Sequence, residues 1–335
     1  MILLLMGKRK MKKIGLALLA VVLTAMSGTS CGQFENQLYG RANVSVNYTD
    51  LGASNPLAKD WQLNSNASRL GFRGSYQISE TLEAIYQLEI EINFNDHISS
   101  TARGKDRIEN RNTYIGLQGS FGRIIAGKYD SIAKTVGREV DRFNDQVLGD
   151  IKSFMEGEDR VSDLVLYTTP SWKGFSVSAG IITDDDSSAV DDGGGLAEGS
   201  TISLDYSNDF VRASIVNNDD IDKQDLTRVM SNFYIGATEI GFIWQQAERI
   251  DIAADEESWF ISAEHRINDN WRIKGQFGIT EYSLLDNKDK QLAVGIDRII
   301  SNDVFVFFNY VQNDRDETVS SHTDFSTAIG IQVSF

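Results

Sequence analysis

Histidine is the side chain best suited to acid–base catalysis or zinc binding near neutral pH, and this chain of 335 residues has three. His97, His265 and His322 lie far apart on different segments, so their spacing suits no zinc site. A Ser-His-Asp site would need a histidine beside a strand serine, whereas His322 falls at the end of a loop. The sequence therefore predicts no enzyme, no metal site and no cofactor.

Acidic residues are the second group of possible ligands. Aspartates gather within 184–192 and at 219–220, but they lack the ligand spacing of an EF-hand, so solvated loops are the favoured interpretation. Residues 1–32 hold five basic and no acidic side chains, and without them 27 basic residues stand against 48 acidic ones, a net charge of −21. Such acidity argues against nucleic acid as a partner.

The elements that carry the charged residues are predicted to be strands. Side chains of a strand point alternately to its two faces. In 324–335 the two faces differ in polarity: Phe325, Thr327, Ile329, Ile331, Val333 and Phe335 share one, and Asp324, Ser326, Ala328, Gly330, Gln332 and Ser334 share the other. The same pattern recurs along the chain behind a secretory signal, and it is typical of a barrel in lipid with a water-filled lumen.

The signal is predicted from the first 32 residues. Lys12 and Lys13 precede the apolar run 14–26, which is too short to span a bilayer and is followed by small residues. We expect a signal peptide over 1–32 with its true start at Met11. Cys31, the only cysteine, would be lipidated in an alternative interpretation, but Gly28 stands where a lipobox usually has leucine, so a cleaved remnant is favoured.

The number of alternating segments predicts the architecture. No later apolar run approaches about 18 residues, so no transmembrane helix is expected. Sixteen segments alternate, an even number that suits a single-chain bacterial barrel. They lie near 38–48, 66–78, 82–95, 109–120, 122–129, 160–169, 173–182, 200–207, 210–217, 228–238, 239–248, 257–267, 270–282, 290–300, 302–312 and 324–335. The prediction is an all-β fold, a 16-stranded antiparallel transmembrane β-barrel over 33–335.

Connectors alternate between short turns, expected at the periplasm, and longer polar loops, expected outside. The third of the long connectors, 130–159, is different because it lacks alternation yet carries apolar side chains such as Val140 and Phe154. Long loops of compact proteins are usually functional or disordered. We expect this one to fold inward and to pack in the lumen.

Five stretches resemble the Gram-negative general porins, especially the neisserial and related proteobacterial branch. Their order and spacing cover most of the chain after the signal: LYGRANVSVNY at 38–48, SRLGFRGSYQI at 68–78, YIGLQGSFGRIIAGKYDS at 114–131, DLVLYTTPSWKGFSVSAG at 163–180, and the terminal Phe335. The resemblance implies a trimeric 16-stranded barrel whose third external loop narrows the pore. It also implies that Phe335 is read by the outer-membrane barrel assembly machinery.

The resemblance further implies a row of basic side chains on the wall facing acidic groups on the loop, which sets up a transverse field. Arg69, Arg111 and Arg160 match wall positions of the family, and Arg41 and Arg73 point inward by strand parity. An alternative is that some arginines pair with inward Glu83, Glu89 or Glu91. The family's enterobacterial PEFGG loop motif is absent, so the acids come from loop position alone: Asp145, Asp150 and Glu156 are the candidates.

The expected function is that of an outer-membrane porin, a channel for passive diffusion of ions and small hydrophilic solutes with a weak preference for cations. The alternatives are a substrate-selective porin and a plugged structural or adhesive barrel. Expected partners are two further copies in a homotrimer, outer-membrane lipid and lipopolysaccharide bridged by divalent ions, and the assembly machinery.

Overall fold

The structure is a computed structural model, and it describes residues 34–52, 60–94, 108–183, 197–249, 254–283, 287–316 and 321–335. The predicted signal peptide with Cys31 lies outside the described residues, as does the aspartate-rich stretch 184–192. No helix among the described residues is long and apolar enough to cross a membrane.

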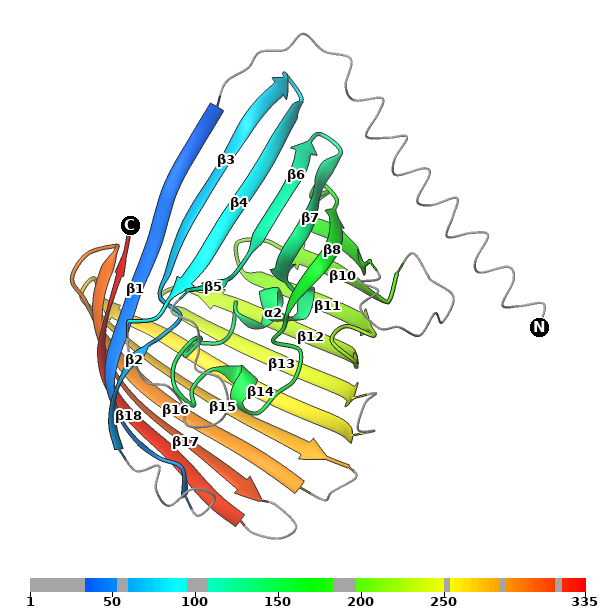
Figure 1. Ribbon diagram of the computed structural model, residues 1–335. Coiled ribbons are helices and arrows are strands. Elements are labelled where there is room, and N and C mark those ends of the chain that lie inside the picture. The colour runs from blue at the N-terminus through cyan, green and yellow to red at the C-terminus, as the bar shows by residue number, and fades with distance from the viewer. Residues whose placement is uncertain are drawn as a thin grey trace.

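Most described residues belong to strands of one antiparallel sheet (Figure 1). The strands are β1 (Phe34–Asp50), β2 (Asp60–Ser65), β3 (Arg69–Ser79), β4 (Leu82–Ile92), β5 (Ile108–Asn110), β6 (Thr113–Gly119), β7 (Gly122–Asp130), β8 (Arg160–Thr168), β9 (Phe175–Ile182), β10 (Gly199–Ser207), β11 (Val211–Asp219), β12 (Gln224–Ile235), β13 (Thr238–Arg249), β14 (Ala254–Asn268), β15 (Trp271–Tyr282), β16 (Asn287–Ile299), β17 (Val304–Asp316) and β18 (Ser321–Ser334). Between β7 and β8 lie the short helix α2 (Ile132–Gly137) and the 3₁₀ turn η2 (Ile151–Ser153).

The 18 segments make 16 barrel strands, because two strands are interrupted. β2 and β3 both pair with β1, and β5 and β6 both pair with β4. One interruption is at Ala67, whose φ of 47° breaks the ladder. Each strand pairs with its neighbour along the chain, and β18 closes the sheet on β1 from Arg41↔Ser334 to Asp50↔Phe325. The predicted 16-stranded antiparallel barrel is confirmed.

The two faces of the sheet have the predicted polarity. In β18 the side chain of Ile329 is 58% exposed on the outer face, whereas Asp324, Ser326 and Ala328 of the inner face are buried. In β1 the same alternation buries Asn43, which is 2% exposed. An apolar outside and a polar inside follow from the period of two in the strand sequences.

The strands extend further than alternation predicts. β1 begins at Phe34, β2 at Asp60 and β12 at Gln224, several residues before the predicted starts. At the starts of β1 and β12 both faces of the strand carry polar residues, so the backbone ladder continues where the polarity pattern has ended. In β2 the alternation itself continues, with Trp61 and Leu63 exposed on the outer face. The end turns at Ser79–Leu82 and Gly119–Gly122 are short, and we call that end of the barrel the short-turn end.

Candidate functional site: the segment between β7 and β8

The segment 131–159 packs against the inner face of the barrel through an apolar cluster. Ile132, Val136, Val140, Ile151 and Phe154 are buried in it. Their partners come from inner positions of the wall, and they are Val216 of β11, Leu226 and Met230 of β12, Ile243 of β13 and Phe260 of β14. A second cluster joins Phe143 and Leu148 to Ala293 of β16 and Val311 of β17. The segment therefore has its own core with the wall.

Buried acids hold the turns of this segment. The Asp141 carboxylate accepts hydrogen bonds from the backbone N–H groups of Phe143 (2.9 Å) and Ile151 (3.0 Å). Asp150, a predicted acid of the loop, is the N-cap of η2 and accepts from the N–H groups of Lys152 and Asp145 at 3.0 and 2.8 Å. Burial beside Asp150 raises the pKa of Asp141 well above its usual range. Asp150 is thus directed at the loop's own backbone.

Side chains of the wall bind the backbone carbonyls of the segment. Ser262 donates to Val140 O, Gln276 to Gly149 O (2.6 Å) and Thr280 to Phe154 O (2.6 Å). Two glycines leave room for the contact. A Cβ at Gly278 would lie 2.2 Å from Phe154 Cζ, and one at Gly241 would lie 2.5 Å from Val140 Cβ.

The tip of the segment contacts the opposite side of the wall. The Asp145 carboxylate accepts hydrogen bonds from the guanidinium groups of Arg41 on β1 and Arg69 on β3, the latter at 2.9 Å. Burial alone would raise the pKa of Asp145, but Arg41, Arg69 and Arg111 outweigh it and hold that pKa well below its usual range. Of the predicted acids, Asp145 is the one in contact with predicted wall arginines.

Arg111 pairs with acids of the wall. Its Nε donates to Glu89 Oε1 at 2.8 Å, and its Nη1 donates to Glu91 Oε2 at 2.5 Å. Tyr39 also donates to Glu89, at 2.9 Å, and Arg69 lies 3.9 Å from it. Arg111 therefore makes the ion pairs with inward glutamates that the alternative interpretation describes.

Arg160 lies where the segment rejoins the barrel. Its Nη2 is 2.9 Å from Asp130 Oδ1, and its Nε donates to Asn112 Oδ1 at 2.9 Å. Arg138 of the segment binds the same Asp130 carboxylate. These contacts link the ends of β7 and β8 to the start of the segment.

The remaining two predicted site residues lie apart from Asp145. Arg73 is exposed on the inner face of β3, where both Nε and Nη2 donate to Gln37 Oε1 at 2.9 and 2.8 Å. Glu156 lies 3.5 Å from Arg249 and accepts from Gln224 Nε2 at 3.0 Å. The structure thus brings together Arg41, Arg69, Arg111 and Asp145, and places the other predicted residues around them.

Sequence reasoning missed a buried ion pair between the segment and β12. Arg228 is fully buried, and its Nη1 donates to Glu158 Oε1 at 2.6 Å and to Ala133 O at 2.7 Å. Burial raises the pKa of Glu158 to about 7, although Arg228 opposes the rise. The sequence did hold a signal for this ion pair. Arg228 shares a strand face with the apolar Leu226 and Met230, and a segment that buries this face must supply an acid for the arginine.

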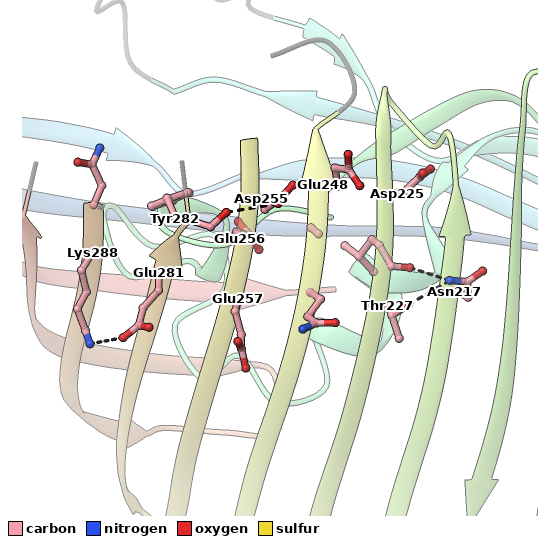
Figure 2. A pocket seen from close by; sticks show the side chains of 15 residues that line it. Asn217, Asp225, Thr227, Glu248, Asp255, Glu256, Glu257, Glu281, Tyr282 and Lys288 are labelled. Atoms are coloured by element: carbon pink, nitrogen blue, oxygen red, sulfur yellow. Dashed lines mark hydrogen bonds and ion pairs between the residues drawn. The ribbon is translucent and has the colours of Figure 1, made fainter. Parts of the chain in front are cut away.

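A hollow of about 770 Å³ is lined by residues from β11 to β16 (Figure 2). They belong to the ends of these strands that lie opposite the short turns. Six carboxylates line it, and Lys288, bonded to Glu281, is the cation among them. Several of its residues, such as Glu257 and Thr227, belong to the outer face of their strands, so the hollow lies at the rim. Within the described ranges no group of three or more His, Cys, Asp or Glu side chains could hold a metal ion.

Known proteins resemble this chain along most of its length. A family model described as Gram-negative porin matches residues 17–318. The major outer membrane protein P.IB of Neisseria sicca is 33% identical over 181 residues, which are 50% of this chain and 46% of that protein, so this match spans about half of the relative. Outer membrane porin protein 32 of Delftia acidovorans is 23% identical over 340 residues, 94% of this chain and 95% of that protein.

Solved structures share the architecture. The anion-selective porin from Comamonas acidovorans superposes with a TM-score of 0.71 at 18% identity, covering 90% of this chain and all of the other. OmpT of Vibrio cholerae in its trimer form gives a TM-score of 0.67 at 15% identity, covering 90% of this chain and 99% of the other. The closed barrel with its polar interior agrees with these relatives, and together with the family match it shows that this outer-membrane protein belongs to the Gram-negative porin family.

Proposed function

We propose that the protein is an outer-membrane porin through which ions and small hydrophilic solutes diffuse passively. The observation that carries the proposal is the ionic cluster inside a closed barrel, where Asp145 of the segment 131–159 lies between Arg41 and Arg69 of the wall. Fixed charges at a narrow waist orient polar solutes and disfavour apolar ones. No chemical step is needed for this activity.

We further propose that 130–159 is the constriction loop, with the short-turn end of the barrel facing the periplasm. Two apolar clusters and the Arg228–Glu158 pair support a loop that stays docked on β11–β17. The arginines Arg41, Arg69, Arg111 and Arg160 would line the waist, and Asp145 would be the acid of the loop that faces them. Asp150 and Glu156 would instead help to hold the loop in its position.

The proposed partners follow from family membership. A homotrimer is supported by the trimeric Vibrio cholerae neighbour, and contact with lipid and lipopolysaccharide is supported by the apolar outer face and the acidic rim. Phe335 would be the residue read by the barrel assembly machinery. It ends β18 beside β1, where its N–H and C=O both bond to Gly40 at 3.0 and 2.8 Å. A cleaved signal peptide over 1–32 would direct export.

One observation favours a second candidate, a plugged structural or adhesive barrel. The segment contacts β1 and β3 through Asp145 and also β12 to β17 through its core, so it extends across the interior. A plug of this kind would leave no path wide enough for hydrated ions.

Conductance of the purified protein in a planar bilayer separates the two candidates. A porin is expected to give ohmic current in steps of three, and a salt gradient then gives the ion preference, which we predict to be weakly for cations. A substrate-selective porin would instead show saturable block by its solute. Heat-modifiable mobility in gels shows whether the purified protein is folded. Absence of current from folded protein would contradict the open channel and favour the plug.

A further inference from the structure

Arg73 and Arg123, two arginines of the inner wall, have no acidic partner among the described residues. Inner-face arginines such as Arg111, Arg228 and Arg315 each lie within 3.5 Å of a carboxylate. Arg73 has hydrogen bonds to an amide oxygen alone, and the side chain of Arg123 makes no hydrogen bond or ion pair within the described part of the chain. Their positive charges are therefore available to a ligand.

Aromatic rings orient both guanidinium groups. Arg73 Cζ lies 4.9 Å from the centre of the Tyr39 ring, and Arg123 Cζ lies 5.1 and 5.8 Å from the rings of Tyr114 and Tyr129. Stacking uses the flat face of a guanidinium and leaves its N–H groups to bind carboxylate or phosphate oxygens. Two of these groups in Arg73, Nε and Nη2, donate to Gln37 Oε1, so a ligand of Arg73 would bind at Nη1 or displace Gln37.

The two arginines lie on β3 and β7, with β4 and β6 between them, and line one hollow. Arg73 of β3 is opposite Gln87 of β4, which is opposite Tyr114 of β6, and β7 with Arg123 follows; Figure 1 shows these four strands side by side. A hollow of about 370 Å³ is lined by both Arg73 and Arg123. Arg123 also lines a second hollow next to the short turns, so the pair lies between the constriction and the short-turn end.

We propose that Arg73 and Arg123 form a binding station for small oxyanions, dicarboxylates in particular, on the short-turn side of the constriction. The inference rests on the proposed channel function. Two guanidinium groups that line one hollow match two carboxylates better than one chloride ion. Glu35 lines the same hollow, and Glu83 accepts from Gln118 nearby at 2.6 Å. These two acids weaken the hold on an anion, which lets a permeating solute leave again.

The test measures block of the single-channel current by succinate added on the short-turn side of the bilayer at constant ionic strength. Wild-type protein is expected to show a saturable decrease of chloride current. The double variant R73Q/R123Q should need about tenfold more succinate for the same decrease, since tenfold corresponds to losing about one charge-assisted contact. 1,4-Diaminobutane, a dication of similar length, should produce no saturable block in either protein.

Arg298→Gln is the matched control. Arg298 also stacks on an aromatic ring, Trp271 at 5.2 Å, but it belongs to the outer face of β16, so its succinate response should equal that of the wild type. If the double variant fails to fold, the single variants R73Q and R123Q are compared, each expected to weaken block about threefold.

Equal block of wild type and double variant would overturn the station. So would a change of the chloride-to-potassium ratio without saturable block, because the arginines would then act only as a diffuse field. Current without any succinate effect contradicts the station and leaves the porin function standing, whereas absence of current from folded wild-type protein contradicts the porin function itself.

Discussion

Asp145→Asn is the substitution that tests the ionic cluster most directly. The carboxylate of Asp145 is shared by Arg41 and Arg69, and its side chain is 11% exposed. Asparagine keeps the shape and can still accept one hydrogen bond, so the change removes a negative charge with little loss of volume. We expect the barrel to fold and the ion preference of the channel to move toward anions.

The size of the effect follows from the charges of the cluster. Arg41, Arg69 and Arg111 are balanced by Asp145, Glu89 and Glu91, so the six groups sum to zero and the variant to +1. A unit charge about 5 Å from a permeating ion is worth about 0.8 kcal/mol in water, and salt at about 0.1 M screens this to about 0.5 kcal/mol. Since chloride gains and potassium loses this amount, the chloride-to-potassium permeability ratio should rise about fivefold.

Reversal potentials under a salt gradient measure that ratio. Asp209→Asn is the control, because it makes the same change of charge at an exposed position in the turn between β10 and β11, and its ratio should stay near that of the wild type. An unchanged ratio in D145N, or a move toward potassium, would refute the reasoning. It would mean that ions pass through the barrel without approaching Arg41 and Arg69.

Three further predictions concern the loop and the barrel closure. Phe154→Ala removes a ring buried against Phe260 and Gly278, so it should cost about 3–5 kcal/mol of docking free energy and raise single-channel conductance. The control Phe277→Ala, on the outer face, should leave conductance unchanged. Burial holds the pKa of Glu158 at about 7, above its unfolded value of about 4.3, so its contribution to stability is complete below about pH 4.3 and is lost as pH rises through 7. The fall in thermal midpoint between pH 5 and pH 8 should therefore be smaller in Glu158→Gln than in the wild type. An equal fall in both proteins would exclude Glu158 as the cause. Gly40→Ala would place a Cβ 2.3 Å from the Phe335 ring, so it should lower the thermal midpoint in the wild type and much less in a Phe335→Ala background; additive effects would argue against the contact.

The fold could be predicted from the sequence because its main signal is local. A strand needs only its own residues to show which side meets lipid, as the exposed Ile329 and the buried Asn43 illustrate. Counting such strands gives the barrel, and their parity places Arg41 and Arg69 on the inner face. Pairing partners then follow from chain order, since each strand lies beside the next one.

The site could be predicted only in part because its contacts join distant residues. Asp145 and Asp150 lie on either side of the apolar pair at 147–148. Nothing local shows that Asp145 reaches the wall while Asp150 caps η2. The difference depends on the backbone, where Asp145 has a φ of 66°. Leu226 and Met230 depart from the polar pattern of the inner face for a similar, non-local reason. They are apolar side chains that the segment 131–159 covers.

These contacts suggest that the apolar side chains and the charged tip of the segment 131–159 have different roles. Fully burying an apolar side chain such as Phe154 or Ile151 is worth about 1.5–3 kcal/mol each, and the two clusters bury several such side chains, whereas Asp145 is the one acid of the tip in contact with Arg41 and Arg69. Docking of the segment therefore depends mainly on its apolar clusters with the wall, to which the ionic contact at its tip adds a single charged group. Because the two are separate, substitutions at position 145 can change ion preference while the loop keeps its place.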